Sequence, residues 1–258
     1  MTAMNLIVQA RARAAFLLTD TASIWSRSGK VAHFGSKVIP VYIDGRAVAA
    51  VAVSGRLEPS DLAERMDEIS PQSLSGFLEE FPEVFRATER ALKKRDAAGS
   101  MAAVIAAFDH ERSRPIGYRI ANDNLLFPPG YRPYELKQTS RHLTEFNPDN
   151  VTLLQSDFCD PRHWEPDRDA EKLIEAQRRD PDILHGRHSI GGEAVLTRVD
   201  ASGVCSKVLK AWPDRVGRRI NPEASVRSTT LGSRLAEIAS KWDTARQIFN
   251  AAVGRVLG

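Results

Sequence analysis

The chain has 258 residues, of which 42% are hydrophobic and 27% charged, as is typical of a soluble globular protein with a core of its own. Its formal net charge of +3 is too small to indicate a nucleic-acid partner. No apolar run approaches the roughly 18 residues of a membrane span, and the two cysteines, Cys159 and Cys205, stand outside any CxxC pattern. We therefore expect a cytoplasmic protein without a disulfide scaffold.

Four short strand-like runs open the chain. The runs at 5–10 and 14–18 flank a basic bend, and the runs at 38–43 and 47–53 flank Asp44-Gly45. This dipeptide favours a tight hairpin because it tolerates positive φ. The runs at 14–18 and 47–53 are nearly continuous in apolar residues, which predicts strands that are covered on both faces.

The hydrophobic period then changes to that of helices. Pro59-Ser60-Asp61 favours the start of a helix, with the proline in its first turn. A longer apolar stripe at helical spacing predicts a second helix within residues 72–98. We expect Pro82 to kink or break this helix, because proline lacks the N–H that the helix interior needs.

Strands return at 101–108 and 116–121. Residues 122–166 are rich in proline and predict long ordered loops with one short helix near 134–143. A helix is expected from Asp169 to about Arg179.

Two further strands, at 193–199 and 204–212, flank a turn. Strands that arrive in hairpins, separated by helices, favour antiparallel sheets with helices packed outside them, which is an α+β class. The sequence predicts a domain over residues 1–212. Residues 213–258 would form a basic linker and a C-terminal amphipathic helix from about 231 to 257.

Four motifs stand at the ends of these predicted elements. Thr19-Asp20-Thr21 closes the second run, Lys37 precedes the third, Ser54-Gly55 closes the fourth, and Ser189-Ile190-Gly191-Gly192 precedes the last hairpin. In this order they resemble proteasome-type β subunits and bacterial ATP-dependent peptidase subunits, of the N-terminal nucleophile (Ntn) hydrolase superfamily. The resemblance covers about residues 2–212 and implies a four-layer αββα sandwich of two mainly antiparallel sheets.

The resemblance also implies a catalytic set of Thr2, Asp20, Lys37 and Gly55. A threonine hydroxyl becomes a useful nucleophile when a neutral amine takes its proton, and the free α-amine of an N-terminal Thr2 would do so. Lys37, held by Asp20, would orient the nucleophile and favour the neutral amine by charge repulsion. The N–H of Gly55 would stabilise the oxyanion.

The pattern departs from the family's at two places. The family's usual spacing before Asp20 falls on Met4, so a nucleophile at Thr2 would need two extra residues in the first hairpin. Arg187 stands where the family carries an aspartate. Two hypotheses follow: a threonine peptidase or amidohydrolase subunit, and a non-catalytic proteasome-like scaffold or assembly subunit, that is, a pseudoenzyme.

No cofactor or metal is expected. The His185/His188 pair lacks a familiar zinc spacing, and so does the pair of Cys159 and His163, which lie close together in the sequence. The expected partners are further copies of this chain, with a ring as one arrangement and with helix 72–98 and the apolar tail as contact surfaces. A peptide or protein is the expected substrate, and neither nucleic acid nor a membrane is expected as a partner.

Overall fold

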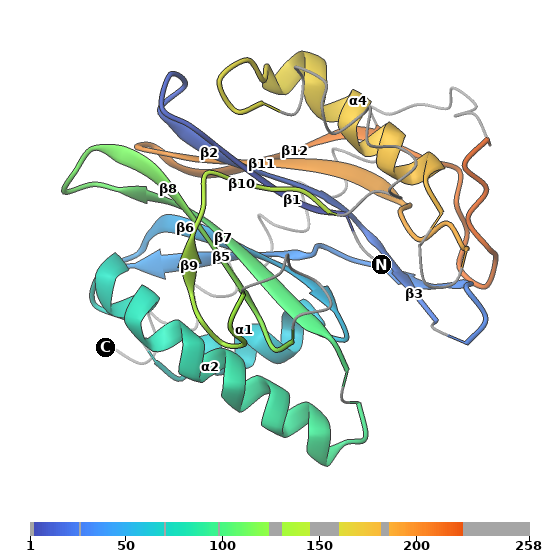
Figure 1. Ribbon diagram of the computed structural model, residues 1–258, viewed down its shortest axis with the longest axis horizontal. Coiled ribbons are helices and arrows are strands. Elements are labelled where there is room, and N and C mark those ends of the chain that lie inside the picture. Colours follow the sequence, from blue (N-terminus) through green and yellow to red (C-terminus); the bar gives the residue numbers. More distant parts are fainter. Residues whose placement is uncertain are drawn as a thin grey trace, which may run out of the picture. The chain divides into compact units, whose positions relative to one another are not determined.

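The computed structural model describes residues 3–25, 27–69, 71–97, 99–123, 131–144, 160–181 and 186–223 (Figure 1). The chain divides into two compact units, Met1–Ala224 and Ser225–Gly258, and the described residues belong to the first. The helix predicted at 231–257 lies outside the described residues. The domain boundary after residue 212 stays a prediction.

The described residues form three sheets, and every strand pair in them is antiparallel. The first sheet has the order β10-β1-β2-β11-β12, with β1 (Met4–Gln9), β2 (Ala14–Asp20), β10 (Arg141–His142), β11 (Glu193–Asp200) and β12 (Gly203–Ala211). The second has the order β5-β6-β7-β8-β9, with β5 (Val38–Ile43), β6 (Arg46–Gly55), β7 (Met101–Asp109), β8 (Arg114–Ala121) and β9 (Lys137–Gln138). The third is a ribbon of β3 (Ala22–Ile24) and β4 (Val31–Phe34).

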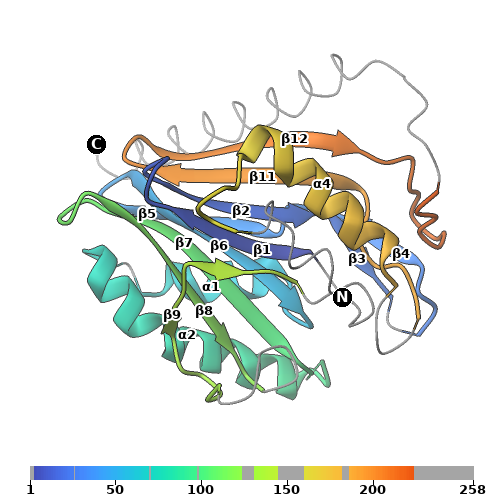
Figure 2. The ribbon, with the colours of Figure 1, turned by 45° about the horizontal axis from the view of Figure 1, so that its top comes forward.

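The described helices pack against the two larger sheets. They are α1 (Pro59–Asp67), α2 (Leu74–Lys94) and α4 (Pro166–Arg179). Helices α1 and α2 share a hydrophobic cluster with the second sheet, and α4 shares one with the first (Figures 1 and 2). The predicted α+β class is confirmed.

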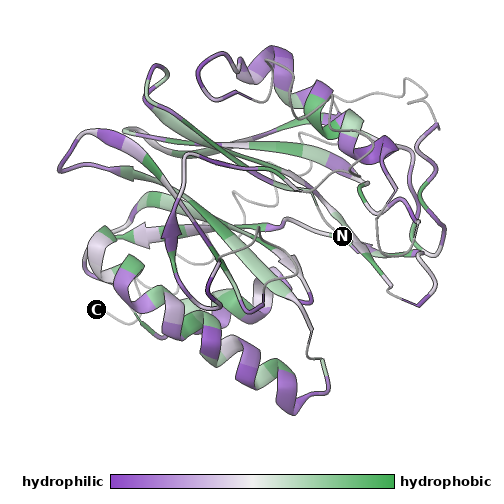
Figure 3. Cartoon of the chain, in the orientation of Figure 1, coloured by the Kyte–Doolittle hydropathy of each residue, from purple (hydrophilic) through white to green (hydrophobic). Residues whose placement is uncertain are grey.

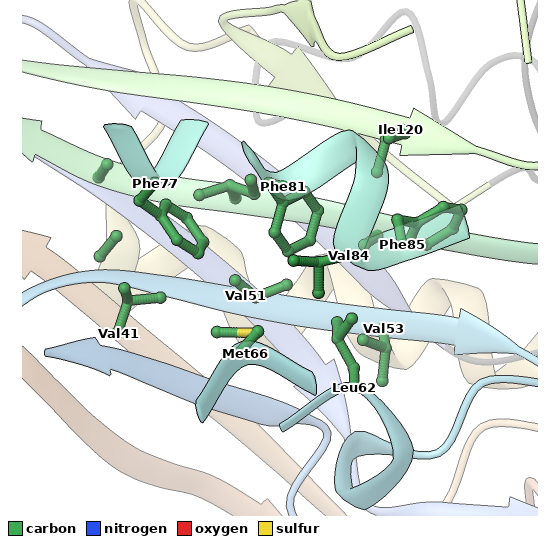
Figure 4. Packing of buried hydrophobic residues seen from close by; sticks show 14 of the residues in the cluster. Val41, Val51, Val53, Leu62, Met66, Phe77, Phe81, Val84, Phe85 and Ile120 are labelled. Carbon is green, nitrogen blue, oxygen red and sulfur yellow. The ribbon is translucent and has the colours of Figure 1, made fainter. Parts of the chain in front are cut away.

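Successive side chains of strand β6 point alternately to the two faces of the second sheet. Val51 and Val53 lie in the cluster with α1 and α2, where Figure 4 shows the phenylalanines of α2 above them. Ala50 and Ala52 point the other way, into a cluster shared with the first sheet. These small side chains let the sheets approach closely, and in Figure 3 the hydrophobic residues gather on the strands.

The predicted hairpin of β5 and β6 is confirmed. Asp44 and Gly45 have φ values of 50° and 73°, the left-handed conformation that a two-residue hairpin turn requires. No helix among the described residues is long and apolar enough to cross a membrane.

The short helix predicted near 134–143 is wrong. This segment instead forms β9 on the edge of the second sheet and β10 on the edge of the first. Between them, the Thr139 N–H donates to the Gly117 carbonyl and the Val8 N–H donates to the Ser140 carbonyl, both at 2.8 Å. Pairing with the edges of two sheets thus satisfies the backbone hydrogen bonds of this segment, and of the edges, better than a short helix would.

Of the kink or break expected at Pro82 in the second helix, the break is wrong, because α2 continues from Leu74 to Lys94 through this residue. The kink stays a prediction. Proline removes one backbone hydrogen bond and costs about 3 kcal/mol in a helix interior. Phe77, Phe81 and Phe85 on both sides of it are fully buried against the sheet, and this burial outweighs the cost.

We expect Phe81→Ala to lower the free energy of unfolding by about 3–5 kcal/mol, because it leaves a cavity between Phe77 and Phe85. Tyr42→Ala is the matched control: this aromatic side chain on β5 is exposed, and its loss should change stability by less than about 1 kcal/mol. Urea unfolding of both variants measures the difference. Equal losses would contradict the packing described for α2.

Candidate functional site

Asp20, the last residue of β2, is fully buried, and its carboxylate accepts four hydrogen bonds. Oδ1 accepts the Ala3 N–H at 3.0 Å and Lys37 Nζ at 2.7 Å. Oδ2 accepts the N–H groups of Ala22 at 3.2 Å and Gly191 at 3.0 Å. This number of donors satisfies a buried charge that would otherwise be costly.

Lys37, directly before β5, is buried and forms an ion pair with Asp20. Its Nζ also donates to the Ala22 carbonyl at 2.6 Å, and its own carbonyl accepts the Val53 N–H at 3.2 Å, which fixes it to β6. Burial lowers the pKa of Lys37 from its usual value, against the opposing attraction of Asp20 and Glu58. Lys37 therefore loses its proton more readily than a surface lysine does.

Gly55 ends β6 at the same end of the second sheet as Lys37, two residues beyond Val53. Its φ is +85°, and a Cβ there would lie 2.0 Å from the Ser100 carbonyl oxygen. Both the backbone angle and the space thus demand glycine. Its role as an oxyanion donor stays a prediction.

Thr2 lies outside the described residues. Its neighbour Ala3 is buried beside the Asp20 carboxylate, and the pairing of β1 with β2 sets Met4 opposite Thr19. The Met4 N–H donates to Thr144 Oγ1 at 2.6 Å. The side chains of Ala3 and Met4 carry no oxygen nucleophile, and Thr2 is the hydroxyl-bearing residue directly before them in the sequence.

A second buried ion pair, which no sequence motif indicated, lies next to the site. Arg178 of α4 is fully buried, and its two terminal nitrogens bind the Asp214 carboxylate at 2.8 and 2.9 Å. Asp214 Oδ2 accepts the Gly192 N–H at 2.9 Å. The apolar stripe of α4 includes Leu173 and Ile174, and the helical period extends it to position 178, which was the available signal.

Arg187, the residue found in the family's aspartate slot, turns toward the β3–β4 connection. Its Nη1 donates to the Arg27 carbonyl at 3.1 Å, and its side chain lies beside Gly29. Within the described ranges, no group of three or more His, Cys, Asp or Glu side chains is arranged to hold a metal ion. His185 and Cys159 lie outside those ranges.

Comparison with known proteins places the fold. No family model and no curated protein matches the sequence. A solved structure, the Anbu (Gly-1) mutant from Hyphomicrobium sp. strain MC1, matches with a TM-score of 0.56 and 13% identity over 98% of this chain and 99% of that one. The chain has a proteasome-like fold. Anbu is itself a proteasome-like Ntn hydrolase.

This comparison corrects the resemblance drawn from the sequence. Proteasome-type β subunits and bacterial ATP-dependent peptidase subunits were the groups named, whereas the similar structure is an Anbu protein. Asp20 and Gly55 end strands of this chain, and Lys37 directly precedes one. Motifs at such positions indicate the scaffold and do not separate its groups.

We expect Asp20→Asn to destabilise the protein by about 3–5 kcal/mol, since it leaves the buried Lys37 without its counter-charge. The double variant Asp20→Asn/Lys37→Met should recover part of this loss, because both charges are then gone. Asp61→Asn, which removes a surface ion pair with Arg95, is the control and should cost less than about 1 kcal/mol. Urea unfolding tests all three, and a double variant that is no more stable than Asp20→Asn alone would contradict the coupling of Asp20 and Lys37.

Proposed function

We propose that this protein is a proteasome-like Ntn hydrolase that cleaves an amide bond, with Thr2 as its nucleophile once Met1 is removed. One observation carries the proposal: the backbone N–H of Ala3, the residue joined to Thr2, donates to the same carboxylate oxygen that binds Lys37. Thr2 is therefore bonded to a residue whose N–H contacts the buried lysine–aspartate pair.

The proposed reaction proceeds in two balanced steps. The Thr2 hydroxyl oxygen attacks the substrate carbonyl carbon while its proton passes to the α-amine, and the C–N bond breaks as that proton moves to the departing amine. Water then cleaves the Thr2 ester and releases the acid. Lys37 would hold the hydroxyl's orientation through its charge, and the Gly55 N–H would bind the oxyanion. A peptide or protein is the substrate class that we propose.

The same proposal includes the finer architecture. We propose that the two five-stranded sheets are the inner layers of a four-layer αββα sandwich, with α1 and α2 outside one sheet and α4 outside the other. The buried hydrophobic cluster shared by β1, β2, β6 and β7 supports this arrangement. A cytoplasmic location is part of the proposal, because Cys205 is an exposed free thiol, which suits a reducing compartment.

Removal of Met1 and labelling of Thr2 are the decisive tests. Intact-mass analysis should show the loss of Met1, and a threonine-directed electrophile should add to Thr2. Thr2→Ala should abolish both labelling and hydrolysis, whereas Thr2→Ser should retain measurable activity because it keeps the hydroxyl. Lys37→Ala should also abolish hydrolysis. Retention of Met1 in the purified protein would overturn the proposal.

A non-catalytic scaffold is the second candidate. The observation in its favour is that Met4 pairs with Thr19 at the end of β2, in the slot where the family's spacing sets the nucleophile. A buried methionine there provides packing and no proton chemistry. Retention of Met1 together with a stable assembly would favour this candidate.

We also propose that the protein forms a homo-oligomer, with a contact around Trp25. Trp25 and Val216 are 64% and 58% exposed, and hydrogen bonds between Val31 and residues 217 and 218 bring their two segments together. Both segments also carry exposed cations, none of which forms an ion pair among the described residues: Arg27, Lys30, Arg215, Arg218 and Arg219. Exposed tryptophan and unpaired arginine are typical of contact surfaces.

Helix 72–98 remains a second proposed contact surface. The apolar side chains of α2 pack on the second sheet, so its outer face would contribute mainly charged contacts. The C-terminal tail, the other surface named from the sequence, lies outside the described residues.

We expect Trp25→Ser to weaken self-association at least about tenfold, as removal of a central aromatic contact does. Tyr42→Ser, which removes an equally exposed aromatic side chain on β5, should leave association unchanged. Sedimentation velocity at micromolar concentration measures both. A wild-type protein that sediments as a monomer would contradict the proposal.

A further inference from the structure

The Gly191–Gly192 turn donates its two consecutive N–H groups to two different buried carboxylates. Gly191 donates to Asp20 Oδ2 at 3.0 Å, and Gly192 donates to Asp214 Oδ2 at 2.9 Å. The Gly191 carbonyl accepts the N–H groups of Thr21 at 3.2 Å and Ala22 at 3.1 Å. One peptide turn therefore links the Asp20–Lys37 pair to a carboxylate that lies far away in the sequence.

This turn has no free space around it. A Cβ at Gly191 would lie 2.5 Å from Asp214 Oδ2 and 2.7 Å from Ile220 Cδ1. A Cβ at Gly192, whose φ is +76°, would lie 2.4 Å from Thr21 Oγ1. The turn is thus confined between Asp214 on one side and the end of β2 on the other, so that a shift on one side is passed to the other.

Asp214 is itself held by a fully buried cation. Arg178 binds it through two parallel hydrogen bonds, and the Arg178 guanidinium stacks on the Trp212 ring with its carbon 4.6 Å from the ring centroid. The same guanidinium donates to the carbonyls of Ile190 at 2.7 Å and Asn221 at 3.0 Å. A bidentate pair fixed by two further acceptors has one geometry, which is what a positioning group requires.

We propose that the Arg178–Asp214 pair positions the candidate site: it holds the Gly191–Gly192 turn against Asp20 and thereby keeps Asp20, Ala22 and Lys37 in contact. Arg178 and Asp214 are positioning residues in this proposal and touch no reacting atom. No function has been assigned to either of them by the sequence motifs or by the comparison with Anbu.

The effect should be readable at Lys37. Without the Asp214 carboxylate, Arg178 and the Gly192 N–H have at most one side-chain oxygen to share, so the turn relaxes and the Gly191 bonds to Asp20 and Ala22 loosen. Water then reaches Lys37, whose charged neighbours among the described residues include Asp20 and Glu58, with His33 beside Glu58 at 3.6 Å. Because burial is the main cause of the lowered Lys37 pKa, hydration should move that pKa upward, toward the usual lysine value.

The test is an NMR titration of protein labelled with ¹³Cε-lysine, in which the Lys37 signal is assigned by its absence from Lys37→Arg. Asp214→Asn should raise the Lys37 pKa by about one unit or more. Since this variant leaves Arg178 buried and unpaired, it could unfold. The double variant Arg178→Met/Asp214→Leu replaces the pair with apolar side chains, which proteins often tolerate, and should raise the Lys37 pKa as well.

Glu89→Gln is the matched control. Glu89 is a buried carboxylate on α2 that binds Tyr134, Asn122 and Lys93, so its loss perturbs a comparable network on the second sheet. The Lys37 pKa should stay at its wild-type value in this variant. Asp214→Glu, which keeps the charge, should give a smaller shift than Asp214→Asn.

A Lys37 pKa that is unchanged or lower in the folded double variant would overturn the inference, as would an equal rise in Glu89→Gln. This inference concerns the site of the proposed hydrolase, but its readout is Lys37 and requires no turnover. A protein with Met1 retained and a Lys37 pKa sensitive to Asp214 would refute the hydrolase and leave the positioning role intact. Labelling of Thr2 together with a Lys37 pKa that does not respond to changes at Asp214 would support the hydrolase and refute the positioning role.

Discussion

A single buried carboxylate organises this molecule. Burying the charge of Asp20 would cost several kcal/mol without partners, and the fold provides them from four places: the N-terminal strand, the start of the β3–β4 ribbon, the residue before β5, and the turn before β11. Each of these segments is held in place by the requirement that the charge be satisfied. The candidate site and the folding constraint are thus the same set of bonds.

A neutral network fixes the N-terminal strand from the other side. The Asn5 side chain, which is fully buried, exchanges hydrogen bonds with Gln177 of α4 at 2.9 and 2.7 Å and accepts the Thr144 N–H at 3.0 Å. A slip of β1 by one residue would turn Asn5 to the opposite face and leave these groups unpaired. The register that sets Ala3 beside Asp20 is therefore specified by polar contacts as well as by packing.

The sequence predicted those parts of the fold that local patterns determine. The β5–β6 hairpin follows from Asp44-Gly45, and α2 follows from its apolar stripe, because both signals act over a few residues. The β3–β4 ribbon gave no such signal. Its strands are short, and residues 217–219, nearly two hundred positions later, complete its backbone hydrogen bonds. Such contacts exist only once the chain has folded.

The candidate site shows the same distinction between local sequence signals and contacts that exist only in the folded chain. Asp20, Lys37 and Gly55 could be named because their motifs, in this order along the chain, resemble those of the Ntn hydrolase superfamily. Asp214 could not, since a lone acid within a basic segment looks like a solvated side chain, and only the buried Arg178 gives it a role. The turn at Gly191-Gly192 was visible as a motif, but the two carboxylates that it serves were not.

Charge balance decides what this site can accept. Arg187, which the sequence set close to the candidate site, binds the Arg27 carbonyl instead, and the buried cation beside the glycine turn is Arg178, neutralised by Asp214. The Asp20–Lys37 and Arg178–Asp214 pairs each carry no net charge. A protonated α-amine arriving beside Lys37 would add a charge that neither pair compensates, and both burial and the nearby ammonium would favour its neutral form. That neutral form is the one able to take a proton from a threonine hydroxyl, as the proposed reaction requires.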